Sequence, residues 1–415
     1  MRRRFPAELR PKAGRRLPGE LRPTNVGRLA AALPHGLADP GFAELIHRID
    51  EGPILGGNRV RLYFRGDQAF AAMREAIGAA TREVLLESYI LKDDGTGRLF
   101  ADALAAAVGR GVTVRVLADF FGSFATHARF WTRMRRKGIE VRLFNPIFPH
   151  VFLQPFRDHR KILVVDRRVA FTGGMNIGDE YGSSRKSKTG PWRDTHARVE
   201  GSAAWEMATV FCEAWSRAGG SEIVLEPLGH NPTEPVRLVT LDARPGRGHG
   251  ETAAALVAIA AAARRTLWIT NAYFAPKRRA VDLLGNAVRR GVDVRILLPG
   301  RTDVPLVRHA GHGYYRALLA RGVRIFEYGA AILHAKTVVA DEAVSLVGSS
   351  NLDFRSFHFN AECNWIFFDP EVGRAFAAAF ADDLTRSSEI TPGSWRRRFW
   401  HAAGDALARS LAPIL

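Results

Sequence analysis

Two segments of the chain repeat one pattern of residues that can do chemistry. In each, a histidine is followed by a lysine, an aspartate, a glycine and an asparagine at the same spacings. The residues are His159, Lys161, Asp166, Gly173 and Asn176, then His334, Lys336, Asp341, Gly348 and Asn351. Histidine acts as a nucleophile, acid or base near neutral pH, and lysine places a compact positive charge beside an anion. The pattern therefore predicts chemistry on an anionic group.

The choice of lysine strengthens this interpretation. The chain has only eight lysines among its 60 basic residues, so a generic positive charge here is almost always arginine. Lysine at both motif positions indicates a need for an ammonium group, which the planar guanidinium of arginine does not replace. The duplicated spacing also disfavours the alternative of two unrelated buried histidines.

An internal repeat supplies the elements that must position these residues. In the first half, apolar residues predict a strand at 84–89, a helix at 99–108 and a strand at 111–117. The same order returns at 269–273, 281–288 and 291–297. Residues two apart in a strand face the same side, so each histidine and its lysine point into one site. Strands separated by helices predict α/β sandwich units with largely parallel strands.

Composition suggests five regions. Residues 1–55 are rich in arginine, proline and glycine, and predict a basic, partly flexible arm with one short helix near 41–48; a merely solvated tail is the alternative. The two repeats occupy 56–220 and 251–390, and prolines and glycines predict a linker at 221–250. Residues 391–415 form a basic amphipathic segment.

Charge and apolar content limit the classes of protein. The formal net charge of +18 predicts attraction to polyanions, either nucleic acid or anionic lipid. The two cysteines form no pattern typical of zinc sites or disulfide scaffolds. We expect neither a membrane span nor a secretory signal, because no apolar run is long enough and none follows the basic N-terminus. These features predict a cytoplasmic protein.

The two motifs resemble the signature of the phospholipase D superfamily, a duplicated His-x-Lys-x4-Asp followed by Gly-Ser-x-Asn. The resemblance spans about residues 55–390 and implies two tandem α/β/α sandwich domains that form a pseudo-dimer with a shared active site. One departure is visible: Gly174 stands where the pattern has serine. It removes a hydroxyl that could help to bind phosphate.

Within the superfamily, several short stretches of the sequence are most similar to those of bacterial cardiolipin synthases. The stretches concerned are 86–90, 192–196, 273–276, 298–303 and 348–353. Many such synthases have two N-terminal membrane spans, and this chain looks like a shorter type without them.

The resemblance also implies roles for individual residues. His159 would attack phosphorus to form a phosphohistidine, and His334 would protonate the leaving alcohol and then deprotonate the incoming one. The groups that would bind phosphate oxygens are Lys161, Lys336, Asn176, Asn351 and Ser349. Neither a metal nor another cofactor is implied, and a metal site built on the motif is disfavoured because protonated lysine has no lone pair.

A nucleophilic imidazole needs a carboxylate to orient it. By analogy with the superfamily, we expect Asp194 to serve His159 and Glu362 to serve His334, since these carboxylates occupy matching places downstream of the motifs. The alternative is that both are ordinary carboxylates at strand ends. Asp166 and Asp341 belong to the motifs, but their place at strand ends predicts bracing.

Two apolar segments favour lipid over nucleic acid. The loop at 144–156 contains Phe148, Val151, Phe152 and Phe156, and residues 395–400 combine aromatic rings with arginines. Either segment could lie at a membrane surface or pack onto the fold. The leading hypothesis is transfer of phosphatidyl between two phosphatidylglycerol molecules at the cytoplasmic side of a bacterial inner membrane, to give cardiolipin. A hydrolytic phosphodiesterase, including a nuclease, and a non-catalytic membrane-binding module remain the alternatives.

Overall fold

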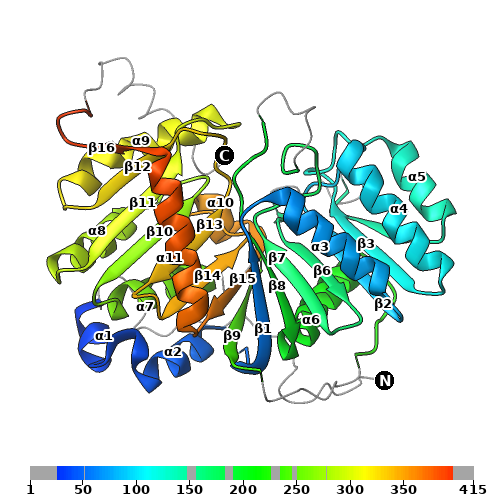
Figure 1. Cartoon of the computed structure of the whole chain (residues 1–415), viewed down its shortest axis with the longest axis horizontal. Coiled ribbons are helices and arrows are strands. Elements are labelled where there is room, and N and C mark those ends of the chain that lie inside the picture. Colours follow the sequence, from blue (N-terminus) through cyan, green and yellow to red (C-terminus); the bar gives the residue numbers. More distant parts are fainter. Residues whose placement is uncertain are drawn as a thin grey trace.

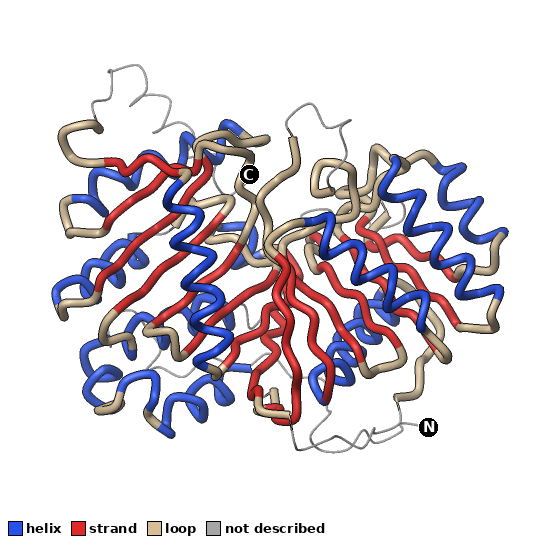
Figure 2. The backbone as a smooth tube through the Cα atoms, viewed as in Figure 1, coloured by secondary structure: helices blue, strands red, loops and turns tan. Residues whose placement is uncertain are grey.

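The computed structural model describes residues 26–50, 52–146, 156–182, 190–225, 234–244, 250–276 and 278–395. Within these ranges the strands form one 16-stranded sheet that crosses the whole molecule, with helices on both faces (Figures 1 and 2). The α/β fold and its two repeats are therefore confirmed, and the halves share a single sheet.

The first half contains these elements in chain order: β1 (Leu55–Tyr63), α3 (Gly66–Ala79), β2 (Glu83–Ser88), α4 (Gly95–Gly109), β3 (Thr113–Asp119), α5 (Ala128–Arg136), β4 (Glu140–Phe144), β5 (Arg157–Asp158), β6 (Lys161–Val165), β7 (Val169–Gly173), β8 (His196–Gly201) and α6 (Ser202–Arg217). The second half contains β9 (Val236–Ala243), α7 (Glu251–Ala262), β10 (Thr266–Asn271), α8 (Arg278–Arg289), β11 (Asp293–Pro299), α9 (Pro305–Leu319), β12 (Arg324–Tyr328), β13 (Lys336–Ala340), β14 (Val344–Gly348), α10 (Phe354–His358), β15 (Asn360–Phe367), α11 (Pro370–Thr385) and β16 (Ser387–Ile390). The helices and strands expected from the repeat are all present.

The sheet has a repeated order about its centre. Strands β1 and β9 lie antiparallel in the middle. Outward from β1 run β8, β7, β6, β2, β3 and β4, and outward from β9 run the matching β15, β14, β13, β10, β11 and β12. Strands β6 and β13, which carry the motif lysines, therefore hold equivalent positions in the two halves.

The expectation of largely parallel strands is wrong. Parallel pairing in the main sheet is confined to β2-β3-β4 and β10-β11-β12, and the remaining neighbours are antiparallel. For the motif strands, which pair antiparallel with β7 and β14, the reason lies in the turns that follow them, where Asp166, Arg167, Asp341 and Glu342 have positive φ. Turns this short join antiparallel strands, whereas a parallel connection needs a dozen or more residues.

Two compositional expectations also differ from the structure. The proposed linker contains β9, an almost fully buried strand between β15 and β1, because its apolar run is hidden among flanking prolines and glycines. The proposed arm contains α1 (Val26–Ala32), a short 3-10 helix (Gly36–Ala38) and α2 (Pro40–Asp50), which covers the expected helix at 41–48. Phe42, Leu45 and Ile46 of α2 are buried in the core that includes α7. The exact domain boundaries stay predictions.

Local sequence explains the elements that support the motifs. The run from Ile162 to Val165 is buried, because alternate residues pack into cores on opposite faces of the sheet. Asp94 and Asp369 cap the first turns of α4 and α11 by accepting backbone N–H groups. In the described part of the chain, no helix combines the length and apolarity required to cross a bilayer. Most of the apolar loop (147–155) and of the C-terminal segment (396–415) lies outside the described residues.

Candidate active site

A cavity of about 530 Å³ lies where the two halves meet. Both motif histidines and both motif asparagines line it. The other lining residues are Tyr89, Ile90, Lys92, Glu180, Tyr181, Trp192, Tyr273, Asp303, Val304, Asp353, Arg355 and Asn360. The structure thus brings His159 and His334 to one cavity, as the duplicated motif predicts.

Backbone pairing between the halves positions each histidine. The His159 N–H donates to the carbonyl of Ala361 at 2.9 Å, next to the short parallel pairing of β5 with β15. In the second half, the His334 N–H donates to the carbonyl of Arg193 at 2.7 Å. Each histidine is therefore attached to the opposite half, beside the residue that precedes a carboxylate, Glu362 or Asp194.

The carboxylates consequently pair across the halves. His159 Nδ1 lies 3.0 Å from Glu362 Oε2, and His334 Nδ1 lies 2.7 Å from Asp194 Oδ2. The two partner residues are those expected, but the expected pairing within each half is wrong. The physical reason is the backbone attachment just described, which places each imidazole against the opposite carboxylate. A carboxylate on Nδ1 leaves Nε2 for reaction.

Both motif lysines are buried beside the histidines. The Lys161 ammonium donates to the carbonyl of His159 at 2.6 Å, and Lys336 Nζ lies 3.2 Å from His334 Nε2. Burial lowers the pKa of Lys161 to about 7 and that of Lys336 to about 8. An anionic phosphate would favour the charged form of both lysines.

Burial lowers the pKa of both histidines, and Lys336 further lowers that of His334, whereas their carboxylates differ in charge state. Burial, followed by the charges of Lys161 and Lys336, lowers the pKa of His159 well below its ordinary value. Burial raises the pKa of its partner Glu362 to about 7. Burial also opposes ionisation of Asp194, but Lys336 and His334 together lower its pKa below the ordinary value. The site therefore combines a neutral His159 with an ionised carboxylate beside His334.

The two motif asparagines line the cavity, but Ser349 does not. Asn176 lines the cavity and donates to the Tyr181 hydroxyl at 2.8 Å, and the side-chain oxygen of Asn351 has no hydrogen-bond partner among the described residues. Ser349 was expected to bind phosphate, but it is fully buried and its hydroxyl donates to Glu362. It braces the carboxylate instead.

The glycine that departs from the motif has a matching explanation. A Cβ atom at Gly174 would lie 2.1 Å from Asp194 Oδ1. Gly174 thus allows the Asp194 carboxylate to lie directly against the backbone, where the other half has a serine that donates to its carboxylate. The difference between the halves concerns support of the carboxylates, and not a phosphate-binding hydroxyl.

Asp166 and Asp341 lie at the far ends of β6 and β13 and do not line the cavity, so they are not catalytic residues. The Asp166 carboxylate accepts the N–H groups of Thr81, Arg82 and Glu83, and Asp341 accepts those of Arg264, Arg265 and Thr266. They join the hairpin turns to the starts of β2 and β10, which is the bracing role expected from their position.

Sequence reasoning assigned no role to the aromatic and charged residues around the histidines. Rings of Tyr181, Trp192 and Tyr273 lie 5.4 to 5.8 Å from the His334 ring, and the Tyr89 ring lies 4.7 Å from that of His159. Arg355 adds a further cation to the lining. The available signal was the similarity to the family at 86–90, 192–196 and 273–276, which include Tyr89, Trp192 and Tyr273. Tyr181 lies outside these stretches.

Comparisons with known proteins agree with this site. The family model described as "Cardiolipin synthase, PLD-like domain" matches residues 73–185 and 256–384, which include both motifs. Cardiolipin synthase A of Pseudomonas aeruginosa is 35% identical over 373 residues, covering 89% of this chain and 76% of that protein. Cardiolipin synthase 1 of Bacillus anthracis is 31% identical over 387 residues, covering 90% and 76%.

Solved structures share the fold. The phosphatidylserine synthase of Haemophilus influenzae matches with a TM-score of 0.70 at 12% identity, covering 90% of this chain and 98% of that one. A polyphosphate kinase from Porphyromonas gingivalis matches with a TM-score of 0.54 over 88% of this chain. With the duplicated motif, the shared cavity and relatives above 30% identity, the chain belongs to the cardiolipin synthase family of the phospholipase D superfamily.

Proposed function

We propose that the protein transfers a phosphatidyl group from one phosphatidylglycerol to another, giving cardiolipin and glycerol. The observation that carries this proposal is the pair of imidazoles from opposite halves in one cavity, each with a carboxylate on Nδ1 and a buried ammonium beside it. The relatives are named cardiolipin synthases, which supports cardiolipin as the product.

In the first step, His159 Nε2 attacks phosphorus. A P–N bond forms, the P–O bond to glycerol breaks, and His334 gives its Nε2 proton to the leaving glycerol oxygen. The low pKa of His159 supports it as the nucleophile, because attack requires a neutral imidazole. The ionised Asp194 supports His334 as the acid, because a carboxylate stabilises the imidazolium.

In the second step, the primary hydroxyl of another phosphatidylglycerol attacks the phosphohistidine. Its proton passes to His334, a new P–O bond forms and the P–N bond breaks, which restores His159. Lys161, Lys336 and the side-chain amides of Asn176 and Asn351 balance the charge that develops on the phosphate oxygens. Water in place of the alcohol would give phosphatidic acid.

We further propose that the protein acts at the membrane surface on the cytoplasmic side. The net charge of +18 supports this placement, because anionic lipids attract basic surfaces.

Incubation of the purified protein with phosphatidylglycerol vesicles tests the proposed reaction. We expect cardiolipin and glycerol in equal amounts, and no product from His159→Asn or His334→Asn at unchanged melting temperature. Phosphatidic acid as the main product would assign hydrolysis instead. Cleavage of DNA without any lipid product would assign a nuclease.

A further inference from the structure

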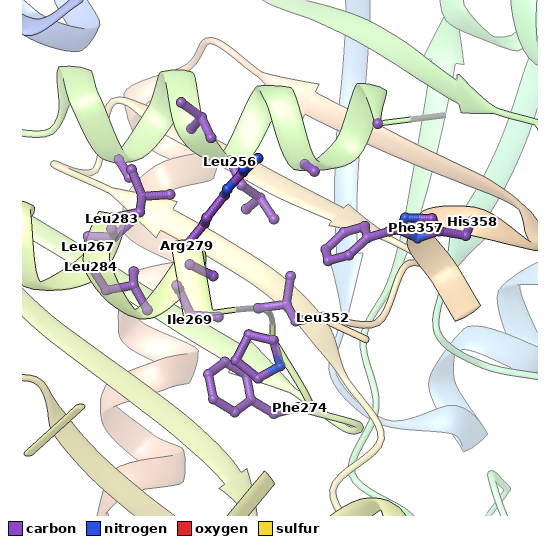
Figure 3. Close-up of a pocket in the computed structure, with 16 residues that line it drawn as sticks. Leu256, Leu267, Ile269, Phe274, Arg279, Leu283, Leu284, Leu352, Phe357 and His358 are labelled. Atoms are coloured by element: carbon purple, nitrogen blue, oxygen red, sulfur yellow. The ribbon is translucent and has the colours of Figure 1, made fainter. Parts of the chain in front are cut away.

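The second half contains a separate, apolar cavity of about 270 Å³. It lies between α7, α8, β10 and the segment that follows β14 (Figure 3). Its lining side chains are almost all hydrocarbon, and the two basic residues among them are Arg279 and His358. The main apolar contacts come from Leu256, Val257, Leu267, Ile269, Leu283 and Leu284. A pocket with such a lining suits an apolar ligand.

In the first half, larger side chains occupy the positions that correspond to the lining of this cavity. Asp166 binds the backbone at 81–83 and Asp341 binds it at 264–266, so the ends of α3 and α7 correspond. In this correspondence Ala253 and Ala260 of the cavity take the places of Phe70 and Ile77.

The facing helix shows the same change. The paired sequences Arg110-Gly111-Val112 and Arg290-Gly291-Val292 align α4 with α8, and Ala280 then takes the place of Phe100. Phe70 and Phe100 are buried and in edge-to-face contact, with ring centroids 5.5 Å apart. Three large side chains of the first half are therefore alanines in the second, and the cavity occupies the space between them.

The apolar cavity adjoins the catalytic one. Tyr273 lines the catalytic cavity and the next residue, Phe274, lines the apolar cavity; Asn351 and Leu352 have the same relation. Phe274 and Leu352 are themselves bridged, and the Ala275 N–H donates to the Leu352 carbonyl at 2.9 Å. In α10, Arg355 lines the catalytic cavity and Phe357 lines the apolar one. The two cavities are therefore lined by neighbouring residues of the same three segments.

We propose that this apolar cavity holds one acyl chain of a phospholipid whose phosphate lies between His159 and His334. The inference rests on the proposed function, because it assumes a lipid phosphodiester in the catalytic cavity. A hydrocarbon chain attached to that diester is the apolar group that must lie within reach of the site. The exposed Arg279 gives the cavity lining a positive charge, which suits an anionic lipid.

Refilling the cavity with the side chains of the first half tests the proposal. The double variant Ala253→Phe/Ala280→Phe restores the two aromatic residues, and Ala280→Leu is a milder form. The control is Ala378→Phe, which adds the same ring to an exposed position of α11. Each protein is assayed with dioleoyl and with monomeric dihexanoyl phosphatidylglycerol.

We expect the double variant to lose about tenfold or more in kcat/KM for the dioleoyl lipid, the effect of leaving a few methylenes in water. Turnover of the short-chain lipid should stay within about twofold, which also shows that the variant folds. Ala280→Leu should give a smaller loss in the same direction, and the control none. Equal effects on both lipids, or no effect on either, would overturn the proposal.

A binding experiment separates this proposal from the proposed function. The inactive His159→Asn protein is irradiated with phosphatidylglycerol that carries a diazirine in one acyl chain, and the labelled peptides are mapped. We expect label on α7 and α8, reduced by Ala253→Phe/Ala280→Phe. Label confined to other elements would overturn the acyl-chain site, even where cardiolipin synthesis is observed. Label on α7 and α8 without any cardiolipin synthesis by the native protein would instead refute the proposed function.

Discussion

His159 and Glu362 are 203 residues apart in the chain and yet form one acid–base unit, as do His334 and Asp194 at a separation of 140. The motif made the histidines and lysines predictable, because each pair lies within one short segment, at the start of a strand and just before it. The pairing was not predictable, because it depends on backbone contacts between segments of different halves. The equivalent positions of Asp194 and Glu362 in the two repeats suggested pairing within each half. That expectation was wrong because sequence positions do not reveal the contacts between halves.

The crossed pairing predicts different effects of Glu362→Gln and Asp194→Asn on the two steps. Loss of an orienting carboxylate typically lowers kcat by about 10⁴. With a p-nitrophenyl phosphodiester, whose leaving group needs no proton, we expect Asp194→Asn to retain formation of the phosphohistidine at His159 and Glu362→Gln to lose it. Rapid quenching and mass spectrometry would measure the adduct. Pairing within each half would give the reverse result.

His196 provides a test of burial without a partner. Its two ring nitrogens have no hydrogen-bond partner among the described residues, and burial lowers its pKa from 6.5 to about 4. A depressed histidine pKa contributes stability that is present above pH 6.5 and is lost as the pH falls toward 4. The matching residue on β15 is Asn364, so His196→Asn is the natural replacement.

Between pH 7 and pH 5, the free energy of unfolding of the native protein should therefore fall by roughly 2 kcal/mol more than that of His196→Asn. Urea denaturation at the two pH values measures both. Parallel losses in the two proteins would show that His196 is not held neutral by burial.

At the scale of elements, the hairpin turns after β6 and β13 carry Asp166 and Asp341. Although partial burial opposes ionisation of Asp166, hydrogen bonds from the backbone at 81–83 lower its pKa. We expect Asp166→Ala and Asp341→Ala each to lower the free energy of unfolding by about 2 kcal/mol, since three backbone N–H groups lose a charged acceptor. Activity at a temperature where both variants are folded should change less than tenfold, in contrast to the motif histidines. A loss of activity comparable to that of His159→Asn would return these aspartates to the catalytic set.

The elements themselves were largely predictable, and their directions were not. Apolar periodicity located β2, α4 and β3 and their counterparts to within a few residues. Whether consecutive strands run parallel depends on the connection, and a turn with residues at positive φ, such as Asp166 and Arg167, has no glycine to announce it. Strand β9 was missed because its eight residues include arginine, threonine and aspartate and stand between two stretches of linker composition.

At the scale of the whole molecule, Arg160 joins the first motif to the central strand of the second half. Its guanidinium lies 2.6 Å from Asp242 on β9 and 3.4 Å from Glu87 on β2, with all three side chains buried. The second motif has Ala335 at the equivalent position. Removal of Arg160 would take a cation from three buried carboxylates, Glu87, Asp158 and Asp242, of which Asp242 keeps its ion pair with Arg244. Breaking a buried ion pair typically costs 3 to 5 kcal/mol.

We therefore expect Arg160→Met to lower the free energy of unfolding by about 3 kcal/mol. The control is Arg324→Met, which removes the guanidinium from a partly exposed ion pair with Glu389 and should cost less than about 1 kcal/mol. Urea denaturation measures both variants. Similar small losses would show that the Arg160 network does not hold the halves together.

The crossing of partners between the repeats also has a genetic consequence. Each imidazole pairs with a carboxylate of the other repeat, so the loss of either repeat would disrupt both histidine–carboxylate pairs. The two repeats must therefore be inherited together. Alleles at codons 159 and 362 should share a phenotype, as should those at 334 and 194. Co-expression of two full-length chains, one defective at residue 159 and the other at residue 362, should restore activity to the same extent as co-expression of two chains that are defective at the same residue.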